Sequence, residues 1–531
     1  MKLREVDFLA LLSAAICIAL GIVSYNAINP DGVAYLDLAA RLREADWGHF
    51  VQGYWSPLYP FLIAVAAAAT GREGADLIGL VHLLNPLIAL FGVVVVWWAA
   101  RQSDNRLFAR AAFPALLVCS AQAPRVEAVT PDLLLVALVA MIGFELLRPN
   151  GVRWRRLGVL MGIAFLAKTS MWPWLLASLI VRLFAARSGD ARREVAKSGA
   201  ICLAVMLLWI VPLSIKSGTP TLGSAARLNA CWYTRECDSR SPDTHAGNHQ
   251  RYQTISFGAS QATVAVLTGT PWTYAPWSDP TEWAAGVTSY ESISPTVQEV
   301  VRYAFTQLVL VFVPWMWHVW LLIVLPLAFL TRRPGIWREL ALEQRSALVV
   351  LLLGLLGLFQ FIAVHVEPRL IAPFVLLFTL GVAAWLTRFG SESEKLPALR
   401  DNRYFVLAFS LVGILGTLPR AWVHGRDQWA IAKATSERLD MISRAEAARV
   451  PPRSGPRRIA VIGQVFPLLN EAYRLGGTIE WQVLRPTPAA VLAWPAADQQ
   501  GLVAWLAQQG ATEAWLNKGG GAFSVLQLPP R

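Results

Sequence analysis

Asn-Pro-Asp-Gly-Val-Ala-Tyr, residues 29–35, opens the stretch that decides how this chain folds, and Gly-Tyr-Trp-Ser-Pro-Leu-Tyr-Pro, residues 53–60, closes it. The stretch directly follows an apolar run, Phe8–Val23, that is long enough to be a membrane helix. It therefore places a carboxylate, several aromatic rings and three prolines at a membrane–water boundary. Asp31 lies between a proline and a glycine, which is typical of a turn. Taken alone, Asp31 is most simply interpreted as the cap of a helix from Val33 to about Asp46.

The composition of the whole chain is not that of a soluble protein. The 531 residues are 55% hydrophobic and only 15% charged, and the mean hydropathy is +0.45, which leaves too few charged residues for a water-exposed surface. The net charge of +12 suggests nucleic acid at first sight. However, the basic residues lie in short clusters between apolar runs, as in the cytoplasmic loops of inner-membrane proteins, and many of the 23 tryptophans flank those runs.

Eleven apolar stretches have lengths near the roughly 20 residues that span a bilayer. They are Phe8–Asn26, Leu80–Ala100, Leu107–Ala121, Pro131–Leu147, Leu157–Thr169, Met171–Phe184, Gly199–Ile215, Tyr303–Leu330, Ala347–Val364, Leu370–Leu386 and Tyr404–Leu418. The first could instead be a cleaved signal peptide. We disfavour this alternative because the run is long and no small-x-small cleavage site follows it.

The distribution of basic residues predicts the orientation. If the amino terminus is cytoplasmic and the spans alternate, all five Arg-rich short loops fall inside. The loops 27–79 and 216–301 and the carboxy-terminal part then fall outside. The sequence thus predicts an α-helical polytopic membrane protein with about 11 transmembrane helices and a small α/β C-terminal periplasmic domain. We expect residues 1–420 to form the transmembrane catalytic domain, residues 421–531 to form the extracytoplasmic domain, and the protein to be multi-pass in the cell inner (plasma) membrane.

The long outer segment and the carboxy-terminal part carry weaker signals. Cys231 and Cys237 lie outside, where a disulfide is chemically allowed, and His245 and His249 have a zinc-like spacing but lie in a loop. A metal site is not indicated. The other three cysteines lie in apolar spans and are expected to be buried and inert; they are Cys17, Cys119 and Cys202.

The carboxy-terminal part contains an expected strand and two expected helices, at Arg458–Gly463, Pro467–Leu475 and Leu502–Gln509. A single glycine after the strand does not make a nucleotide-binding fingerprint.

Ionisable residues gather on the predicted outer face, where such residues are costly and tend to mark function. They are Asp31, Arg125, Glu127, Asp132, Lys168, His365, Glu367 and Arg369. Each has a structural alternative: Asp132 as a helix N-cap, Lys168 as a snorkelling side chain, and Glu367 and Arg369 as a mutual ion pair. For each residue taken singly, the structural role is the favoured interpretation. The gathering of one carboxylate base with several cations on one face, however, favours a functional site.

The order of these motifs resembles the GT-C superfamily of membrane glycosyltransferases. The closer likeness is to bacterial protein O-mannosyltransferase-like and lipid A aminoarabinose transferase-like enzymes. The resemblance rests on Asp31 with Pro57-Leu58-Tyr59-Pro60, on the spacing of Glu127 and Asp132, on the segment 165–169 and on the segment 367–373. It covers the eleven spans and not the carboxy-terminal domain. This chain has Asp31-Gly32 where many relatives carry Asp-Glu, so a second acidic role, if the reaction needs one, would pass to Glu127, or the acceptor would differ.

The resemblance implies a reaction and a set of roles. A sugar would move from a polyprenyl-phosphate carrier to an acceptor hydroxyl on the outer face, with inversion and with Asp31 as the general base. Catalytic candidates are Asp31, Glu127 and Asp132. Candidates for binding the donor phosphate are Arg369, Lys168, Arg125 and His365. Candidates for binding the substrate are Tyr35, Trp55 and Tyr59. No cofactor is expected, a divalent metal is not indicated, and the expected partners are the lipid-linked donor, a lipid, glycan or protein acceptor and membrane lipids, with no nucleic acid.

Two other classes of protein remain open. A transporter or flippase would move the lipid-linked sugar without chemistry, but transporters place charges near the bilayer midplane, often in inverted repeats, and no repeat is evident. A non-catalytic assembly protein would keep the charges on the membrane face without any transfer activity. Neither the sugar nor the acceptor is identified by the sequence.

Overall fold

The computed structural model describes most of the chain. The described residues are 2–23, 28–102, 112–113, 115–116, 119, 128–148, 151–226, 228–229, 252–267, 272–283, 301, 305, 345–361, 366–392, 433–444, 457–463, 465, 468–485, 487–519 and 522–528. The predicted third, eighth and eleventh spans lie almost wholly outside these ranges, as does the predicted domain boundary at residue 420. The cysteines and histidines of the long outer segment also lie outside them.

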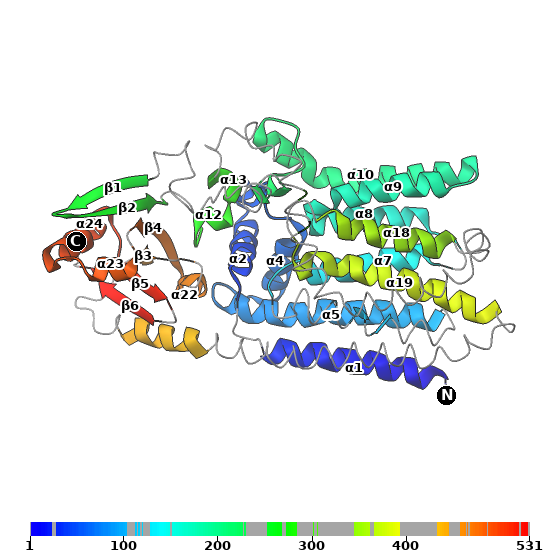
Figure 1. Cartoon of the computed structure of the whole chain (residues 1–531), viewed down its shortest axis with the longest axis horizontal. Helices are drawn as coiled ribbons and strands as arrows, with labels where there is room; N and C mark the ends of the chain where they lie inside the picture. Colours follow the sequence, from blue (N-terminus) through cyan, green and yellow to red (C-terminus); the bar gives the residue numbers. More distant parts are fainter. Residues whose placement is uncertain are drawn as a thin grey trace.

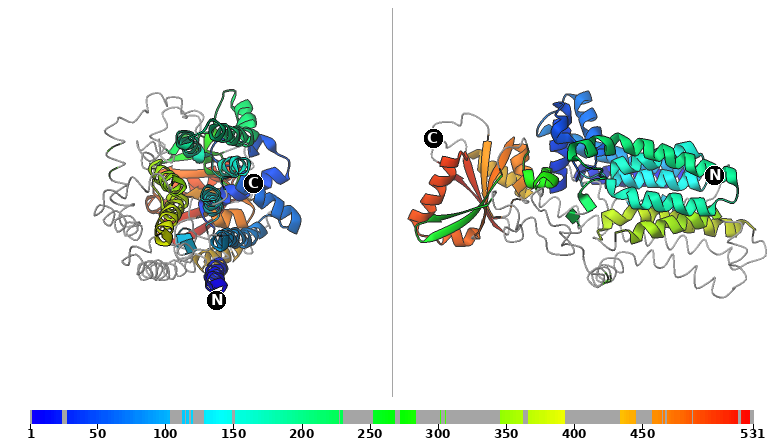
Figure 2. Two further views of the ribbon diagram at one scale, coloured as in Figure 1. Left: turned by 90° about the vertical axis from the view of Figure 1, so that its right-hand side faces the viewer. Right: turned by 90° about the horizontal axis from the view of Figure 1, so that it is seen from above.

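Eight of the predicted spans are helices that run side by side along the longer half of the molecule (Figures 1 and 2). They are α1 (Lys2–Val23), α5 (Asp76–Gln102), α7 (Asp132–Leu146), α8 (Trp154–Ala167), α9 (Trp172–Ala185), α10 (Gly189–Ser217), α18 (Arg345–Phe359) and α19 (Pro368–Glu392). In the described part of the chain, α5 and α10 have the length and apolar composition to cross a membrane, and five shorter helices are apolar. A mainly helical architecture is therefore confirmed, while the number of spans stays a prediction.

The predicted break between the fifth and sixth spans is a sharp turn. Helix α8 ends at Ala167, Lys168 takes an extended conformation, and a short 3-10 helix, η2 (Thr169–Met171), leads into α9. Pro173 lies in the first turn of α9, where its missing N–H costs no intrahelical bond. The turn therefore leaves the Lys168 side chain at the end of a helix and not along its side.

Helices α2 (Pro30–Arg43) and α4 (Leu58–Thr70) lie crosswise between the bundle and the α/β domain, with the short α3 (Trp47–Phe50) between them in the chain (Figure 1). The helix expected from Val33 starts at Pro30 instead, because Pro30 is tolerated in a first turn. Its N-cap residue is Asn29, and Asp31 lies within the first turn. The interpretation of Asp31 as the helix cap is therefore wrong.

The α/β domain contains one six-stranded sheet with the order β1-β2-β4-β3-β5-β6. The strands are β1 (Tyr252–Phe257), β2 (Ser260–Val266), β3 (Arg457–Ile462), β4 (Gly477–Arg485), β5 (Glu513–Gly519) and β6 (Ala522–Gln527). β3 is parallel to β4 and β5, and the other pairs are antiparallel. The expected carboxy-terminal α/β unit is confirmed, but its sheet also takes in the hairpin β1–β2 from the long outer segment, which extends the sheet along the edge of β4.

The two faces of this sheet belong to different hydrophobic clusters, as the period-two alternation of a strand requires. On β3, Ile459 and Val461 join the large cluster that continues through α22 (Leu469–Arg474) to the helical part. Ala460 and Ile462 join a second cluster with α23 (Pro488–Leu492) and α24 (Ala496–Gln509). The domain is thus packed onto the rest of the molecule through one face of its sheet.

A buried carboxylate, Asp37, fastens the outer segment to α2. Asp37 is 6% exposed and accepts hydrogen bonds from the Thr273 N–H at 3.0 Å, the Thr273 hydroxyl at 2.8 Å and the Ser278 hydroxyl at 2.6 Å. Thr273 lies two residues before α12 (Ala275–Ser278), and Ser278 is the last residue of that helix. The same segment reaches the sheet, since the Ile479 N–H donates to the Thr273 carbonyl at 2.9 Å. The outer segment therefore bridges α2 and β4.

The ionisation of Asp37 should affect stability. Burial raises the pKa of the Asp37 carboxyl from 3.8 to about 6, although the hydrogen bonds from Ser278 and Thr273 favour the charged form. Because the folded-state pKa lies above the ordinary value, Asp37 contributes stability that is fully present below about pH 4 and is lost as the pH rises through about 6.

We therefore expect the free energy of unfolding of the wild type, minus that of Asp37→Asn, to fall by roughly 3 kcal/mol between pH 4 and pH 7.5. Unfolding measured across this range in detergent checks it. The control is Asp440→Asn, at an exposed position of the helix 433–444, for which the difference should stay flat. A flat difference for Asp37→Asn as well would show that burial does not perturb this carboxyl.

Candidate active site

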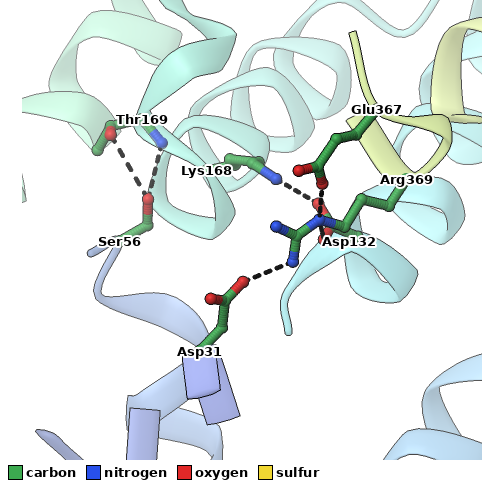
Figure 3. A network of polar contacts seen from close by, with 7 residues as sticks. All are labelled: Asp31, Ser56, Asp132, Lys168, Thr169, Glu367 and Arg369. Carbon is green, nitrogen blue, oxygen red and sulfur yellow. Dashed lines mark hydrogen bonds and ion pairs between the residues drawn. The ribbon is translucent and has the colours of Figure 1, made fainter. Parts of the chain in front are cut away.

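Five ionisable side chains from four separate elements converge where α2 meets the helical bundle (Figure 3). Asp31 lies in the first turn of α2, Asp132 begins α7, Lys168 follows α8, and Glu367 and Arg369 flank the first residue of α19. Asp31 and Arg369 are 338 positions apart in the chain. The sequence predicted that such residues share one face, and the structure brings these five into direct contact.

Arg369 holds two of the carboxylates at once. Its Nη1 donates to Asp31 Oδ2 at 2.5 Å, and its Nε donates to Glu367 Oε2 at 2.5 Å. Only a guanidinium offers donors in a fixed planar fork of this kind. The expected pairing of Glu367 with Arg369 is confirmed, and it does not exclude a further partner. In this state the Asp31 carboxylate is engaged by a cation and is not a free base.

Asp132 and Lys168 form the second pair of the cluster. Asp132 is 1% exposed and Lys168 is 19% exposed, so the ion pair lies largely away from water. The other carboxylate oxygen, Asp132 Oδ2, lies 4.0 Å from Arg369 Nε and has no hydrogen-bond partner in the described part of the chain. Asp132 therefore links the two cations, and it begins α7 as expected but is not the N-cap, which is Pro131.

Local packing positions Asp31 and explains the glycine that follows it. The Asn29 side-chain oxygen accepts a hydrogen bond from the Val129 N–H at 3.0 Å, which ties the start of α2 to the segment before α7. A Cβ at Gly32 would lie 2.7 Å from Val129 Cβ and 2.8 Å from Ile28 Cγ1. Because such distances are shorter than carbon atoms tolerate, a second acidic side chain does not fit beside Asp31 in this packing.

A cavity of about 240 Å³ opens beside the cluster. Among the substrate-binding candidates, Tyr35 and Trp55 line it, and their ring centroids are 5.0 Å apart in an edge-on arrangement. Burial, and then the charges of Asp132 and Asp31, raise the pKa of Tyr35 well above its usual value, so Tyr35 offers a neutral hydroxyl. The Trp55 indole N–H donates to the Trp277 carbonyl at 2.9 Å, which ties the outer segment to this wall of the cavity.

Tyr59, the third candidate for binding substrate, does not line the cavity. Its ring is fully buried, and its hydroxyl donates to Asn85 Oδ1 at 2.7 Å. It packs edge-on against Tyr35, with centroids 5.3 Å apart. In this structure Tyr59 therefore supports Tyr35 from behind and makes no surface for a ligand.

The turn that carries Lys168 is held by a serine from the first outer loop. Ser56 Oγ accepts a hydrogen bond from the Thr169 N–H at 2.8 Å, and both residues line the cavity (Figure 3). This contact sets the position of the backbone next to Lys168. The uncharged polar residues Ser56, Thr130, Ser170 and Gln360 were not predicted to belong to a site. The signal that could have identified Gln360 is its position inside an otherwise apolar predicted span.

Three candidates lie outside the described residues, namely Glu127, Arg125 and His365. Their predicted roles stay predictions. Within the described part of the chain, no group of three or more His, Cys, Asp or Glu side chains is arranged to hold a metal ion. The expected burial of Cys17, Cys119 and Cys202 is confirmed.

Comparison with known proteins found similarity only at the level of structure. No family model and no curated protein matches the sequence. The crystal structure of ArnT from Cupriavidus metallidurans bound to undecaprenyl phosphate is 15% identical, with 88% of this chain and 84% of that chain covered and a TM-score of 0.47. The apo structure of the same protein is 13% identical, with 94% and 88% covered and a TM-score of 0.48. At this identity the likeness establishes neither a reaction nor a substrate.

The buried pair of Asp132 and Lys168 should be energetically coupled. Removing one partner leaves a charge without its counterion in a poorly solvated place, so Lys168→Met and Asp132→Asn should each cost about 3 kcal/mol of unfolding free energy. The double variant should lose about 1–3 kcal/mol less than the two single losses together. Unfolding of the four proteins in mixed detergent micelles measures this.

The exposed pair of Lys197 and Glu194 on α10, with side chains 48% and 38% exposed, is the matched control. Lys197→Met and Glu194→Gln should couple by less than about 1 kcal/mol. Equal coupling in the two cycles would mean that Asp132 and Lys168 are not a buried pair in solution.

Proposed function

We propose that this chain is an integral membrane glycosyltransferase of the GT-C type, which moves a sugar from a polyprenyl-phosphate carrier to an acceptor hydroxyl on the outer face of the membrane. The observation that carries the proposal is the cluster in which one arginine, Arg369, contacts Asp31 and Glu367 beside a cavity, with Asp132 and Lys168 next to it. A carboxylate base and two cations at the rim of a cavity are what transfer from a phosphate carrier needs.

The chemistry assigned to Asp31 is that of a general base. Asp31 takes the proton of the acceptor hydroxyl, and the hydroxyl oxygen attacks the anomeric carbon. The bond from that carbon to the phosphate oxygen breaks, and its electron pair leaves with the polyprenyl phosphate. The sugar inverts because attack and departure occur on opposite faces.

The cations have the complementary task. Arg369, and Lys168 with it, neutralise the charge that grows on the leaving phosphate. Because three carboxylates and two cations make up the described cluster, the phosphate must compete with Asp31 and Glu367 for Arg369. Binding of the donor would thereby release Asp31 from its ion pair and restore it as a base. The ion pair of Arg369 with Asp31 thus becomes part of the cycle.

The arrangement of the helices supports the proposed orientation. The cluster and the α/β domain lie at the same end of the helical bundle (Figure 1). Basic residues gather at the other end: Arg153 lies between α7 and α8 and Arg187 between α9 and α10, while Arg156 and Arg192 lie near the starts of α8 and α10. Excess positive charge is typical of the cytoplasmic side. The proposal therefore places the amino terminus in the cytoplasm, and the site and the α/β domain outside.

Removing the charge of Asp31 should stop transfer without unfolding the protein. For Asp31→Asn we expect kcat to fall by about 10²- to 10⁴-fold, because an amide does not accept the hydroxyl proton. The measurement is release of free polyprenyl phosphate from radiolabelled polyprenyl-phosphate sugars by purified protein in detergent. Asp190→Asn, at an exposed position in the first turn of α10, should behave as the wild type.

Full activity of Asp31→Asn would remove Asp31 from the mechanism. A wild type that turns over no donor, but moves lipid-linked sugar across reconstituted vesicles, would replace the transferase by a flippase.

Arg369→Lys keeps the positive charge and loses the fork that contacts two groups at once. We expect kcat/KM for the donor to fall by about 10²- to 10³-fold, with part of the loss in KM because the phosphate is held less well. Steady-state kinetics with varied donor concentration measures both constants. The control is Arg43→Lys on α2, whose guanidinium binds the Arg72 carbonyl and Glu73 away from the cavity. Unchanged kinetics for Arg369→Lys would mean that charge alone, and not geometry, is required.

A further inference from the structure

Several residues that line the cavity carry polar atoms that are buried and have no hydrogen-bond partner among the described residues. These atoms are the Thr130 hydroxyl, the Ser170 hydroxyl, Asp132 Oδ2 and both polar atoms of the Gln360 amide. A buried polar group without a partner costs about 1–3 kcal/mol, so such groups are uncommon in native proteins. Because these residues line one cavity, we expect a ligand in it to supply hydrogen bonds to side chains that turn toward it.

Gln360 is the most informative member of this set. It is the only polar residue in the apolar run 347–364, and it lies in the turn that directly follows α18. Its backbone N–H is satisfied by the Leu356 carbonyl at 3.1 Å, so only the side chain lacks a partner. No requirement of the helix explains an amide at this position, which points to a role toward the cavity.

Gln360 and Ser170 are held on a rigid frame. Ser170 belongs to η2, directly before α9, and the Trp174 indole N–H of α9 donates to the Leu353 carbonyl of α18 at 2.8 Å. Trp174 is fully buried and packs against Phe374 with ring centroids 5.4 Å apart. Since α9 and α18 are locked together, the two polar side chains keep their relative position without a ligand, as a pre-formed binding site requires.

The chemistry of the set selects its ligand. An amide presents one donor group and one acceptor, and a hydroxyl offers both functions. A prenyl chain would leave every one of these atoms unsatisfied. A phosphate accepts hydrogen bonds and would leave Gln360 Oε1 without a donor. Sugar hydroxyl groups both donate and accept, and two neighbouring hydroxyls match the two ends of an amide.

We infer that Gln360 and Ser170 form a subsite that binds hydroxyl groups of the transferred sugar and thereby selects the donor. The inference rests on the proposed function and deepens it, since it assigns the sugar to the neutral polar part of the cavity and leaves the ionised cluster to the phosphate and the acceptor proton. Trp172 and Trp277 line the same cavity and give the sugar ring apolar surface, in the usual mixture of aromatic walls and few polar groups.

The test compares donor sugars with their monodeoxy forms. Polyprenyl-phosphate glucose, mannose, galactose and arabinose are offered to purified wild type, and release of polyprenyl phosphate identifies the best donor. Its monodeoxy analogues are then compared with it. For the wild type we expect kcat/KM to fall about tenfold for at least one analogue, because the unmet amide is left buried. Gln360→Met, which keeps the length and approximate volume of the side chain, should lower kcat/KM for the parent sugar about tenfold and bring that analogue level with it.

Controls separate binding from folding. Gln253→Met, at an exposed position of β1, should keep the discrimination of the wild type, and Ser170→Ala serves as the second variant if Gln360→Met does not fold. Unchanged discrimination between every parent and deoxy pair in both Gln360→Met and Ser170→Ala would overturn the subsite while the transferase function stands. A wild type that releases polyprenyl phosphate from none of the four donors would overturn the proposed function itself, and the subsite with it.

Discussion

The rest of this molecule depends on the ion pairs that the Arg369 guanidinium makes with Asp31 and Glu367. The guanidinium joins the first turn of α2 to the start of α19 through Asp31 and Glu367, across 338 positions of sequence. The Arg369 and Asp31 side chains are 30% and 14% exposed, so the ion pair is partly shielded from water and depends on the good geometry of its partners. Every element around it serves that geometry: the turn after α8 presents Lys168, the start of α7 presents Asp132, and Ser56 holds the turn in place.

Helix α2 carries the proposed base and is restrained on all sides. Its start is tied to Val129 by Asn29 and packed so closely that a Cβ at position 32 would lie 2.7 Å from Val129 Cβ. Its middle is tied to the long outer segment by Asp37. Such restraint keeps Asp31 within reach of Arg369 and leaves little freedom for the helix to move. A change in the site upon donor binding is therefore expected to occur in the side-chain pairing and not in the position of the helix.

The sheet couples the outer segment to the carboxy-terminal domain. Strands β1 and β2 extend the sheet beside β4, and Ser278 of α12 donates a hydrogen bond to Asp37. The outer segment therefore runs from the sheet to the wall of the cavity, which Trp277 lines. Trp277 belongs to this wall and accepts the hydrogen bond of Trp55. The carboxy-terminal domain is thus attached to the site through the outer segment.

The sequence by itself determined what depends on local pattern. Apolar runs of bilayer length predicted the helices, the break at Ser170 and the strand from Arg458, because hydrophobic periodicity is local. The accumulation of charge at the ends of those runs predicted that Asp31, Asp132, Lys168 and Arg369 share a face. Only the tertiary structure decided which side chains form ion pairs and hydrogen bonds with each other. Asp31 contacts Arg369 and does not cap its helix, and Tyr59 lies behind the cavity. Asp37 is bonded by Ser278, 241 positions away, and Gln360 lines a cavity built from several separate elements. Such contacts depend on how separate helices pack against each other, and packing has no signature in the sequence of either helix alone.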